Sequence, residues 1–314
     1  MSQSASQKNS ILVAFACVYF FWGSTYGAIH VAGLHIAPPL VGATRSLLST
    51  LIMAGICMAR GVSLRVSWPA AWRLILVGVL IMTVNNLMLI WGETKVPSGY
   101  ASLVIAMIPI FVAVLETILP GGETLNLRGW LGTLLGAIGM FALLWPALHR
   151  SAGVPPDHRT ILGFLILIFA ALAFAIGSVA SRRFHFQMDT LVATTWEIGA
   201  AGILNLLIAT GAGNFRTAHW TPHGLLAIAY LSVFGSVVGL TAYTYLLQHV
   251  PVTKVATYAF VNPVVAVLIG VILFRERLAH AEIVGMLLII AAVATVIFSR
   301  TRPAAPLLEL PIEE

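Results

Sequence analysis

The stretch YTYLLQHVPVTKVATYAFVNPVVAVLIGVILFRER, residues 243–277, decides the fold. A polar corner over 248–253 leads into about 20 mostly apolar residues, the length of one membrane span. Asn262 and Pro263 interrupt these residues halfway, and a charged triplet at 275–277 ends them. In water a proline inside an apolar helix is a defect, whereas in lipid a cavity or a neighbouring helix can accommodate the freed carbonyl. The stretch therefore indicates a broken helix of a membrane protein.

The same layout occurs near the middle of the chain. Pro97 opens a segment, Pro109 breaks it, and a Gly122-Glu123 corner ends it. Three pairs of residues share one offset of 154 residues, namely Pro97 and Pro251, Pro109 and Pro263, and Gly23 and Gly177. We interpret the chain as a tandem repeat of one membrane unit.

Composition excludes the ordinary soluble classes. Hydrophobic residues make up 59% of the 314 residues and charged residues only 9%, which does not keep a domain of this length in solution. Cys17 and Cys57 fall in apolar runs, so we expect packing thiols and no disulfide framework. The net charge of +6 fits basic residues in cytoplasmic loops, and we expect no nucleic-acid partner.

Spans of about 20 apolar residues are expected at ten places. They cover about 11–33, 38–59, 70–92, 98–118, 127–146, 160–181, 190–211, 223–247, 253–273 and 279–299. This divides the chain into an N-terminal segment (1–10), a first five-helix repeat (11–154), a second five-helix repeat (155–299) and a C-terminal tail (300–314). Lys and Arg are more frequent on the side of the two termini, which places both termini in the cytoplasm.

An odd number of spans per copy has a topological consequence. With five spans each, the second copy enters the membrane from the side opposite to the first. Such inverted repeats are typical of secondary transporters, whose binding site lies near the midplane between the halves. The expected fold class is an all-α polytopic membrane protein with ten transmembrane helices arranged as two inverted five-helix repeats.

Several motifs give the chain a resemblance to the EamA family of the drug/metabolite transporter superfamily. They are WGST at 22–25, Arg45 in the second span, and two proline-broken helices that end in a Glu corner. The second corner, Arg275-Glu276, departs from the usual Gly-Glu, which Gly122-Glu123 keeps. The resemblance covers about 11–299. It implies a ten-helix exporter of small metabolites in a bacterial inner membrane and does not name a substrate.

Two charged residues fall within spans. Arg45 lies in the second span, where burying a charge costs a few kcal/mol at least, so we expect it to face the bundle interior, either as part of a substrate site or as a structural anchor. Glu197 lies in the seventh span, the repeat partner of the second. Desolvation favours its protonated form, which suits a proton carrier, but the sequence favours a neutral, hydrogen-bonded structural role over proton coupling.

The other candidates are polar or aromatic side chains within spans. The candidate substrate-binding residues are Trp22, Ser24, Thr25, Arg45, Asn85, Asn86, Trp196, Glu197, Ser236, Tyr243, Tyr258 and Asn262, with Pro109 and Pro263 as helix breaks. Glu116 is expected to cap a helix or to reach the membrane surface. Glu123 and Glu276 are expected to accept N–H bonds at the start of the next helix.

The sequence favours a secondary carrier for amino acids or similar amphiphilic metabolites, with protons as a candidate coupling ion. A channel-like or facilitative pore is the alternative. A membrane enzyme acting on lipid-linked substrates is less favoured, because the acidic residues are spread singly. No P-loop occurs, so ATP is not expected to drive transport. We expect no cofactor, no metal and no catalytic residue, and the sequence leaves the oligomeric state open.

Overall fold

A computed structural model describes residues 5–34, 36–93, 95, 104–151, 158–274, 279–299 and 301–303. Pro97, the boundary between the expected repeats at 154 and 155, the Arg275-Glu276 corner and the tail beyond 303 lie outside the described residues.

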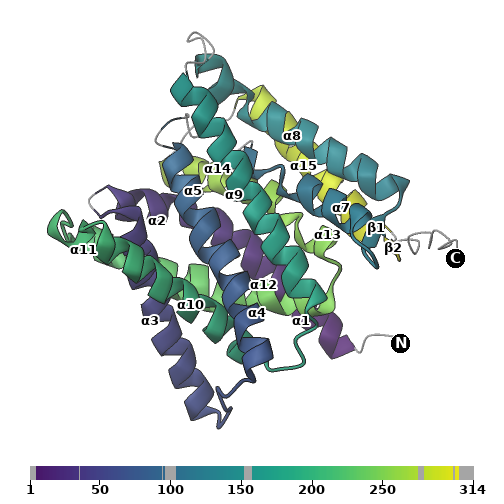
Figure 1. Ribbon diagram of the computed structural model, residues 1–314. Helices are drawn as coiled ribbons and strands as arrows, with labels where there is room; N and C mark the ends of the chain where they lie inside the picture. Colours follow the sequence, from purple (N-terminus) through teal and green to yellow (C-terminus); the bar gives the residue numbers. More distant parts are fainter. Residues whose placement is uncertain are drawn as a thin grey trace, which may run out of the picture.

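The N-terminal half is a succession of apolar helices (Figure 1). Its elements are α1 (Ala5–Cys17), η1 (Val18–Trp22), α2 (Gly23–Gly33), α3 (Pro38–Ala59), α4 (Trp68–Gly78), η2 (Val79–Val84), α5 (Asn85–Glu93), α7 (Ile108–Ile118), β1 (Glu123–Leu125) and α8 (Leu127–Ser151). Helices α3 and α4 each begin with a proline in the first turn, where a missing N–H costs little.

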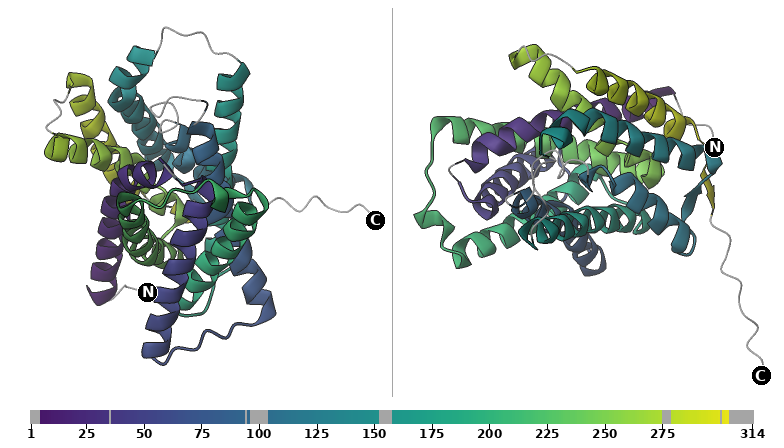
Figure 2. Two further views of the ribbon diagram at one scale, coloured as in Figure 1. Left: turned by 90° about the vertical axis from the view of Figure 1, so that its left-hand side faces the viewer. Right: turned by 90° about the horizontal axis from the view of Figure 1, so that it is seen from above.

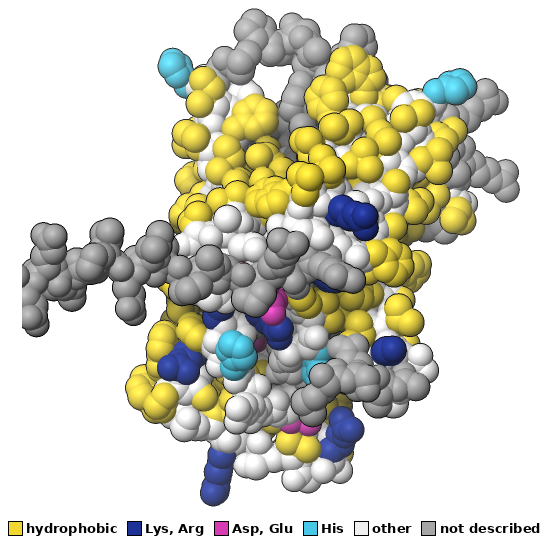
Figure 3. Space-filling view, turned by 90° about the vertical axis from the view of Figure 1, so that its right-hand side faces the viewer, with side chains coloured by type: hydrophobic (Ala, Val, Ile, Leu, Met, Phe, Trp, Pro, Cys, Tyr) yellow, Lys and Arg dark blue, Asp and Glu magenta, His cyan; other side chains and the backbone are white. Residues whose placement is uncertain are grey.

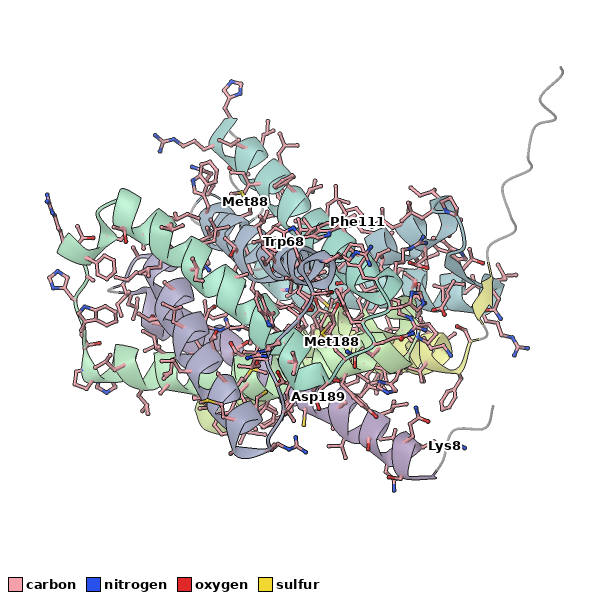
Figure 4. The ribbon with its side chains drawn as sticks, turned by 60° about the horizontal axis from the view of Figure 1, so that its bottom comes forward. Lys8, Trp68, Met88, Phe111, Met188 and Asp189 are labelled. Atoms are coloured by element: carbon pink, nitrogen blue, oxygen red, sulfur yellow. The ribbon has the colours of Figure 1, made fainter. Side chains whose placement is uncertain are left out.

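The C-terminal half is a similar succession of apolar helices. Its elements are α9 (His158–Arg183), α10 (Thr190–Gly211), η3 (Asn214–Arg216), α11 (Pro222–Tyr230), η4 (Leu231–Val238), α12 (Gly239–His249), α13 (Val252–Val255), α14 (Tyr258–Phe274), α15 (His280–Phe298) and β2 (Thr301–Pro303). Asp189, labelled in Figure 4, caps α10 by accepting a hydrogen bond from the Leu191 N–H.

Length and composition identify the membrane-spanning helices. Among the described residues, nine helical segments are long and apolar enough to cross a bilayer, and α7 is shorter at 11 residues. The surface agrees with lipid contact, because large apolar side chains such as Leu51, Ile272 and Phe298 are more than two-thirds exposed. Figure 3 shows such side chains over the upper part of one side, with Lys and Arg below. The chain is an all-α polytopic membrane protein.

Helices of one half pack mainly against helices of the other. Contacts join α3 with α10, α8 with α15, α5 with α9, α2 with α11, α7 with α9, and α2 with α14. The α8–α15 pair lies along one flank of the bundle (Figure 1). The buried core therefore lies between the two halves, where residues such as Tyr243, Phe260 and Leu167 are almost fully enclosed.

In the described part of the chain, three spans contain a π-helical segment, namely η1, η2 and η4. A π-helix adds a residue to the turn, is rare, and is frequent at functional sites because it redirects side chains. The apolar periodicity of the sequence does not predict these segments.

The expected helix break at Pro263 is wrong. Pro263 lies inside α14, which continues through it, and the interruption falls earlier, at the turn Ala256-Thr257 between α13 and α14. Proline removes the N–H that would bond to the carbonyl four residues before, but it leaves the helical backbone angles accessible. Pro109 stands in the first turn of α7, directly after a turn at Ala106-Met107, so a break does precede it.

One end of the molecule, here named the strand end, holds β1 and β2, the end of α9 at Arg183, and the corner between α12 and α13. β1 pairs antiparallel with β2, with Glu123 opposite Pro303 and Leu125 opposite Thr301. Helix α13 contacts β1. Figure 2 shows the strands and the beginning of the chain on the same side of the molecule.

Candidate functional site

Four aromatic rings from four different spans meet inside the bundle. We call them the aromatic cluster: Trp22 at the end of η1, Phe174 in α9, Tyr243 in α12 and Tyr258 at the start of α14. The ring centroid of Trp22 lies 4.9 Å from those of both Tyr243 and Tyr258, and Phe174 lies 5.6 Å from Tyr243. Most of these pairs are tilted or edge-on, the geometry that aromatic quadrupoles favour. The cluster joins both halves of the chain.

The indole of Trp22 is held against η4 and α12. Its Nε1–H donates to the carbonyl of Gly235 over 2.9 Å. A Cβ at Gly239 would lie 2.5 Å from the same nitrogen, so only glycine leaves room for the ring. Gly23, the next residue, packs on Val265 and on the carbonyl of Asn262. Trp22 is therefore fixed between two spans of the other half.

Arg45 joins α3 to η4. Its Nε–H donates to Ser236 Oγ over 2.8 Å, and its carbonyl accepts a hydrogen bond from Ser232 Oγ at 3.2 Å. Ser49, one turn further along α3, donates to the Ser232 carbonyl at 3.1 Å. The ion pairs among the described residues do not include Arg45. The guanidinium thus has a hydroxyl partner on one side and no carboxylate to neutralise it within the described bundle.

Gly235 connects Arg45 to the aromatic cluster. A Cβ built there would lie 3.6 Å from Arg45 Nη2 and 3.1 Å from the methyl group of Thr25, while the Gly235 carbonyl binds Trp22. A cation and a set of aromatic faces are therefore neighbours across one glycine. This combination can bind an anionic group beside an apolar or planar body.

Glu197 is buried on α10, where it contacts α12 and α4. Its side chain is buried, with Oε2 accepting a hydrogen bond from Thr244 Oγ1 at 3.2 Å. Within the described structure Oε1 has no hydrogen-bond partner. Gly78 packs directly against the Glu197 backbone. Arg45 and Glu197 do not form an ion pair, although they lie on the contacting helices α3 and α10.

Two further polar contacts support the cluster. The hydroxyl of Tyr243 donates to Ser178 Oγ over 2.6 Å, and Ser178 in turn donates to the Phe174 carbonyl. Asn262 follows Tyr258 by one helical turn and therefore shares its face of α14. It is 4% exposed, and its Oδ1 has no partner among the described residues. A donor group of a ligand would satisfy this oxygen.

The remaining predicted residues make local or peripheral contacts. Ser24 bonds to the Tyr230 hydroxyl, and Thr25 donates to the Trp22 carbonyl. Asn85 donates to the Ala170 carbonyl of α9, and Asn86 donates to Met82 in its own span. Trp196 donates to the Leu64 carbonyl in the α3–α4 loop. The bonds of Asn85 and Trp196 therefore link separate segments of the chain, whereas that of Asn86 stays within its own span.

Sequence reasoning missed Phe174, Ser178, Ser232 and Thr244. Phe174 and Ser178 lie in the stretch that aligns with the WGST motif, so the repeat itself pointed to them. Nothing in composition distinguishes a site phenylalanine from a core phenylalanine. Ser232 and Thr244 belong to η4 and α12, where the π-helical turn decides which side chains point inward.

A groove of about 730 Å³ lies on the other face of α12. Its walls are α1, the end of η4 and the start of α10, with Ala14, Val238, Thr241 and Tyr245 among the lining residues. Figure 4 labels Lys8 on α1, the helix that borders it. Tyr243 is not part of its lining, so the groove is separate from the aromatic cluster.

These features define a multi-pass membrane protein with a cation and an aromatic cluster at the junction of its halves. The chain belongs to the EamA-like transporter family, which it matches twice, over residues 9–145 and 161–298. It therefore carries two tandem family units and is a membrane transporter.

Similar proteins extend over nearly the whole chain. A protein of Escherichia coli (strain K12) named as the uncharacterized inner membrane transporter YedA is 32% identical over 304 residues, covering 96% of this chain and 95% of that protein. The uncharacterized transporter YvbV of Bacillus subtilis is 24% identical over 94% of this chain and 93% of its own length. A crystal structure with 22% identity matches with a TM-score of 0.78 over 91% of this chain and 96% of its own, which shows the shared fold.

Proposed function

We propose that the protein is a secondary active transporter that exports amino acids or similar small amphiphilic metabolites across a bacterial inner membrane. The family and the relatives named as transporters support the class. The substrate, the direction and the mechanism are our inference from the site. Both termini lie in the cytoplasm in this proposal, as the distribution of Lys and Arg favours.

The proposed architecture has ten spans in two inverted repeats, over 11–154 and 155–299. The helix contacts support it, because they keep their pattern when the two halves are exchanged. The second span packs on the seventh (α3 on α10) and the fifth on the tenth (α8 on α15). The contact of α5 with α9, third span with sixth, has its counterpart in that of α11 with α2, eighth with first. A pseudo-two-fold axis between the halves accounts for all of these pairs.

The substrate path passes the aromatic cluster and Arg45. The observation that carries this proposal is Arg45, a cation inside a span that is bonded to Ser236 and has no carboxylate partner within the described bundle. An uncompensated charge at this depth is costly and marks a site for an anionic group. The four rings beside it offer the apolar surface that the rest of an amphiphilic substrate needs.

Protons are the proposed coupling ion, with Glu197 as their carrier. Its Oε1 lacks a hydrogen-bond partner among the described residues, so one oxygen of this buried carboxyl group is open to a proton. Thr244, which bonds to Glu197, follows Tyr243 of the aromatic cluster directly in α12. A protonation event at Glu197 can thus be felt at the site through α12.

Flux into or out of liposomes tests the proposal. Purified protein is reconstituted, loaded with a panel of labelled amino acids and related carboxylates, and assayed with and without a proton gradient. We expect gradient-driven flux of at least one solute. Flux that only equilibrates the solute would identify the channel-like alternative, and no flux for any solute would contradict the proposal.

A variant pair connects this flux to the site. We expect Arg45→Ala to lower flux about 10-fold or more, since a hydrogen bond to a charged group contributes about 1.5–3 kcal/mol. Arg60→Ala, at the exposed end of the same helix, serves as the control and should retain full flux. Equal flux in the two variants would show that Arg45 does not take part in the substrate path.

A further inference from the structure

Both ion pairs of the described residues lie at the strand end, and both join one family unit to the other. Arg182 pairs with Glu123 at 3.2 Å, and Arg183 pairs with Glu116 at 3.4 Å. The two glutamates belong to the first unit and the two arginines to the second. These contacts fasten the halves together at one face of the bundle.

Arg182 binds three groups at once. Its Nη2 donates to Glu123 Oε1, while Nη1 donates to the carbonyls of Leu247 and Gln248 at 3.2 and 3.0 Å. Those carbonyls belong to the last turn of α12, the negative end of the helix dipole. One planar guanidinium therefore ties the β1 corner to the end of the span that carries Tyr243.

Arg183 and Glu116 hold the corner itself. Glu116 is 2% exposed, and its Oε2 accepts the Glu123 N–H at 2.6 Å while Oε1 faces Arg183 Nε. Arg183 also donates to the Pro120 carbonyl at 2.8 Å. Glu116 is therefore the residue that caps the corner, and Glu123, predicted from the sequence to bond the next helix start, instead binds Arg182.

An apolar layer lies between these charges and the aromatic cluster. Leu247 follows Tyr243 by one turn of α12 and is 1% exposed, and its carbonyl is one of those that Arg182 binds. Val250, Val252 and Val255 at the α12–α13 corner are buried in the same apolar core. From the cluster outward, the order is aromatic rings, then aliphatic side chains, then ion pairs.

The charged layer is not fully satisfied. Within the described structure, Glu123 Oε2 and Arg183 Nη2 are buried without a hydrogen-bond partner. Such groups gain partners when water reaches them, so exposing this face offsets part of the cost of separating the ion pairs. A contact of this kind can hold the halves together and can still be released.

We propose that the apolar layer and the layer of ion pairs together form a gate, which closes the path to the aromatic cluster at the strand end. Arg182 is the residue that holds this gate shut. The inference rests on the proposed transport function for what passes the gate. Its closed state can be measured without any substrate.

Cysteine accessibility tests the gate. Leu247→Cys is placed in a chain whose Cys17 and Cys57 are replaced by Ser, and the protein in lipid nanodiscs is labelled with a membrane-impermeant maleimide. We expect slow labelling with Arg182 present and labelling about 10-fold faster or more with Arg182→Gln, given the charge-assisted bonds lost. Arg182→Lys keeps the positive charge but loses the planar guanidinium that binds several groups at once. Its labelling rate should lie between those of the chain with Arg182 and of Arg182→Gln.

Controls separate a gate from a fold defect. Arg65→Gln, an exposed arginine in the α3–α4 loop, should leave the labelling rate unchanged. Glu123→Gln keeps the carbonyl contacts of Arg182 and should raise the rate by a smaller factor at an unchanged melting temperature. Equal rates with and without Arg182, or the same rise with Arg65→Gln, would overturn the gate. Absence of flux in liposomes would instead contradict the transport proposal and leave the labelling result standing.

Discussion

The third and eighth spans contain the same irregularity and use it differently. η2 begins at Val79 and η4 at Leu231, 152 residues later, and their ends at Val84 and Val238 are 154 residues apart. The separation of the ends equals the repeat offset of the sequence and that of the starts is two residues shorter, so the two π-helical segments occupy corresponding places in the two halves. Both redirect the side chains of their span toward the contact between the halves.

The residues that face inward differ between the two segments. In η2 the buried residues are Ile81, Met82 and Thr83, with Ile81 packed against Gly177 of α9 and Thr83 making a long bond to the Ala201 carbonyl. In η4 three of the buried residues are small, and Ser232, Gly235 and Ser236 provide the contacts to Arg45 and Trp22, beside the apolar Leu231. The same backbone irregularity therefore serves helix packing in the first half and, in the second half, the contacts to the residues of the proposed site. Substitutions at matched positions should therefore affect stability in η2 and transport in η4.

The largest effect is expected at Gly78, the residue before η2. A Cβ there would overlap the backbone of Glu197, and a backbone gives way less readily than a side chain. We expect Gly78→Ala to destabilise the fold by about 1–3 kcal/mol or more, as overpacking does. Thermal unfolding in detergent measures it. Gly55→Ala in α3, with open space around the site, is the control, and equal melting temperatures of the two variants would refute the packing role.

Gly239→Ala, just after η4, should act on transport more than on stability. Its Cβ would meet the Trp22 indole at 2.5 and 2.8 Å and the Phe234 carbonyl at 3.0 Å, and displacing the held side chain disturbs the fold less than displacing the Glu197 backbone at Gly78 does. Displacement of the ring breaks the Trp22–Gly235 hydrogen bond and opens the aromatic cluster. We expect flux about 10-fold lower, the equivalent of about 1.4 kcal/mol. If Gly239→Ala lowers the melting temperature as much as Gly78→Ala does and retains its flux, the residues beside η4 serve packing and not transport.

Hydroxyl removal gives a smaller contrast. Ser236→Ala takes away the partner of Arg45 Nε, and we expect the KM for transport to rise about 3- to 10-fold, because the guanidinium loses its fixed orientation. Thr83→Val in η2 removes only a long bond of 3.4 Å to the Ala201 carbonyl. Its KM should stay within about twofold of the wild-type value, the effect of losing at most a weak neutral bond. Concentration series of initial flux measure both, and a larger shift in Thr83→Val would assign binding to η2 as well.

Tyr243→Phe should have the smallest effect. The ring stays in the aromatic cluster and only the hydrogen bond to Ser178 is lost. We expect about 1 kcal/mol lower stability and flux within about twofold of wild type. Tyr230→Phe, which loses its bond to Ser24 beside η4, is the matched comparison. A strong loss of flux in Tyr243→Phe alone would mean that its hydroxyl contacts the substrate.

The sequence predicted an all-α polytopic membrane protein correctly, because membrane spans follow from composition. Apolar length located the nine spans found among the described residues, and costly polar groups within spans pointed to Arg45 and Glu197. Trp22, Arg45, Ser236, Tyr243 and Tyr258 do come together in the structure. The repeat offset located counterpart segments before any contact was known.

Other features depend on geometry that the residue pattern does not encode. A π-helical turn has the same apolar composition as an α-helical turn, so η2 and η4 could not be anticipated. Asn85 resembled a site residue, yet it bonds to a carbonyl of α9, because an amide in lipid serves helix packing as readily as binding. Pro263 resembled a break, yet α14 continues through it. The pairing of Arg182 with Glu123 required the ends of distant spans to be placed together.

The small sheet at the strand end has a consequence for biosynthesis. β1 follows the fourth span, but its partner β2, Thr301–Pro303, follows α15. During translation the backbone edge of β1 therefore has no partner strand until α15 and β2 have been made. Insertion order and final closure are linked in this way, and a chain released early by a stop codon before residue 301 leaves that edge open to quality-control proteases.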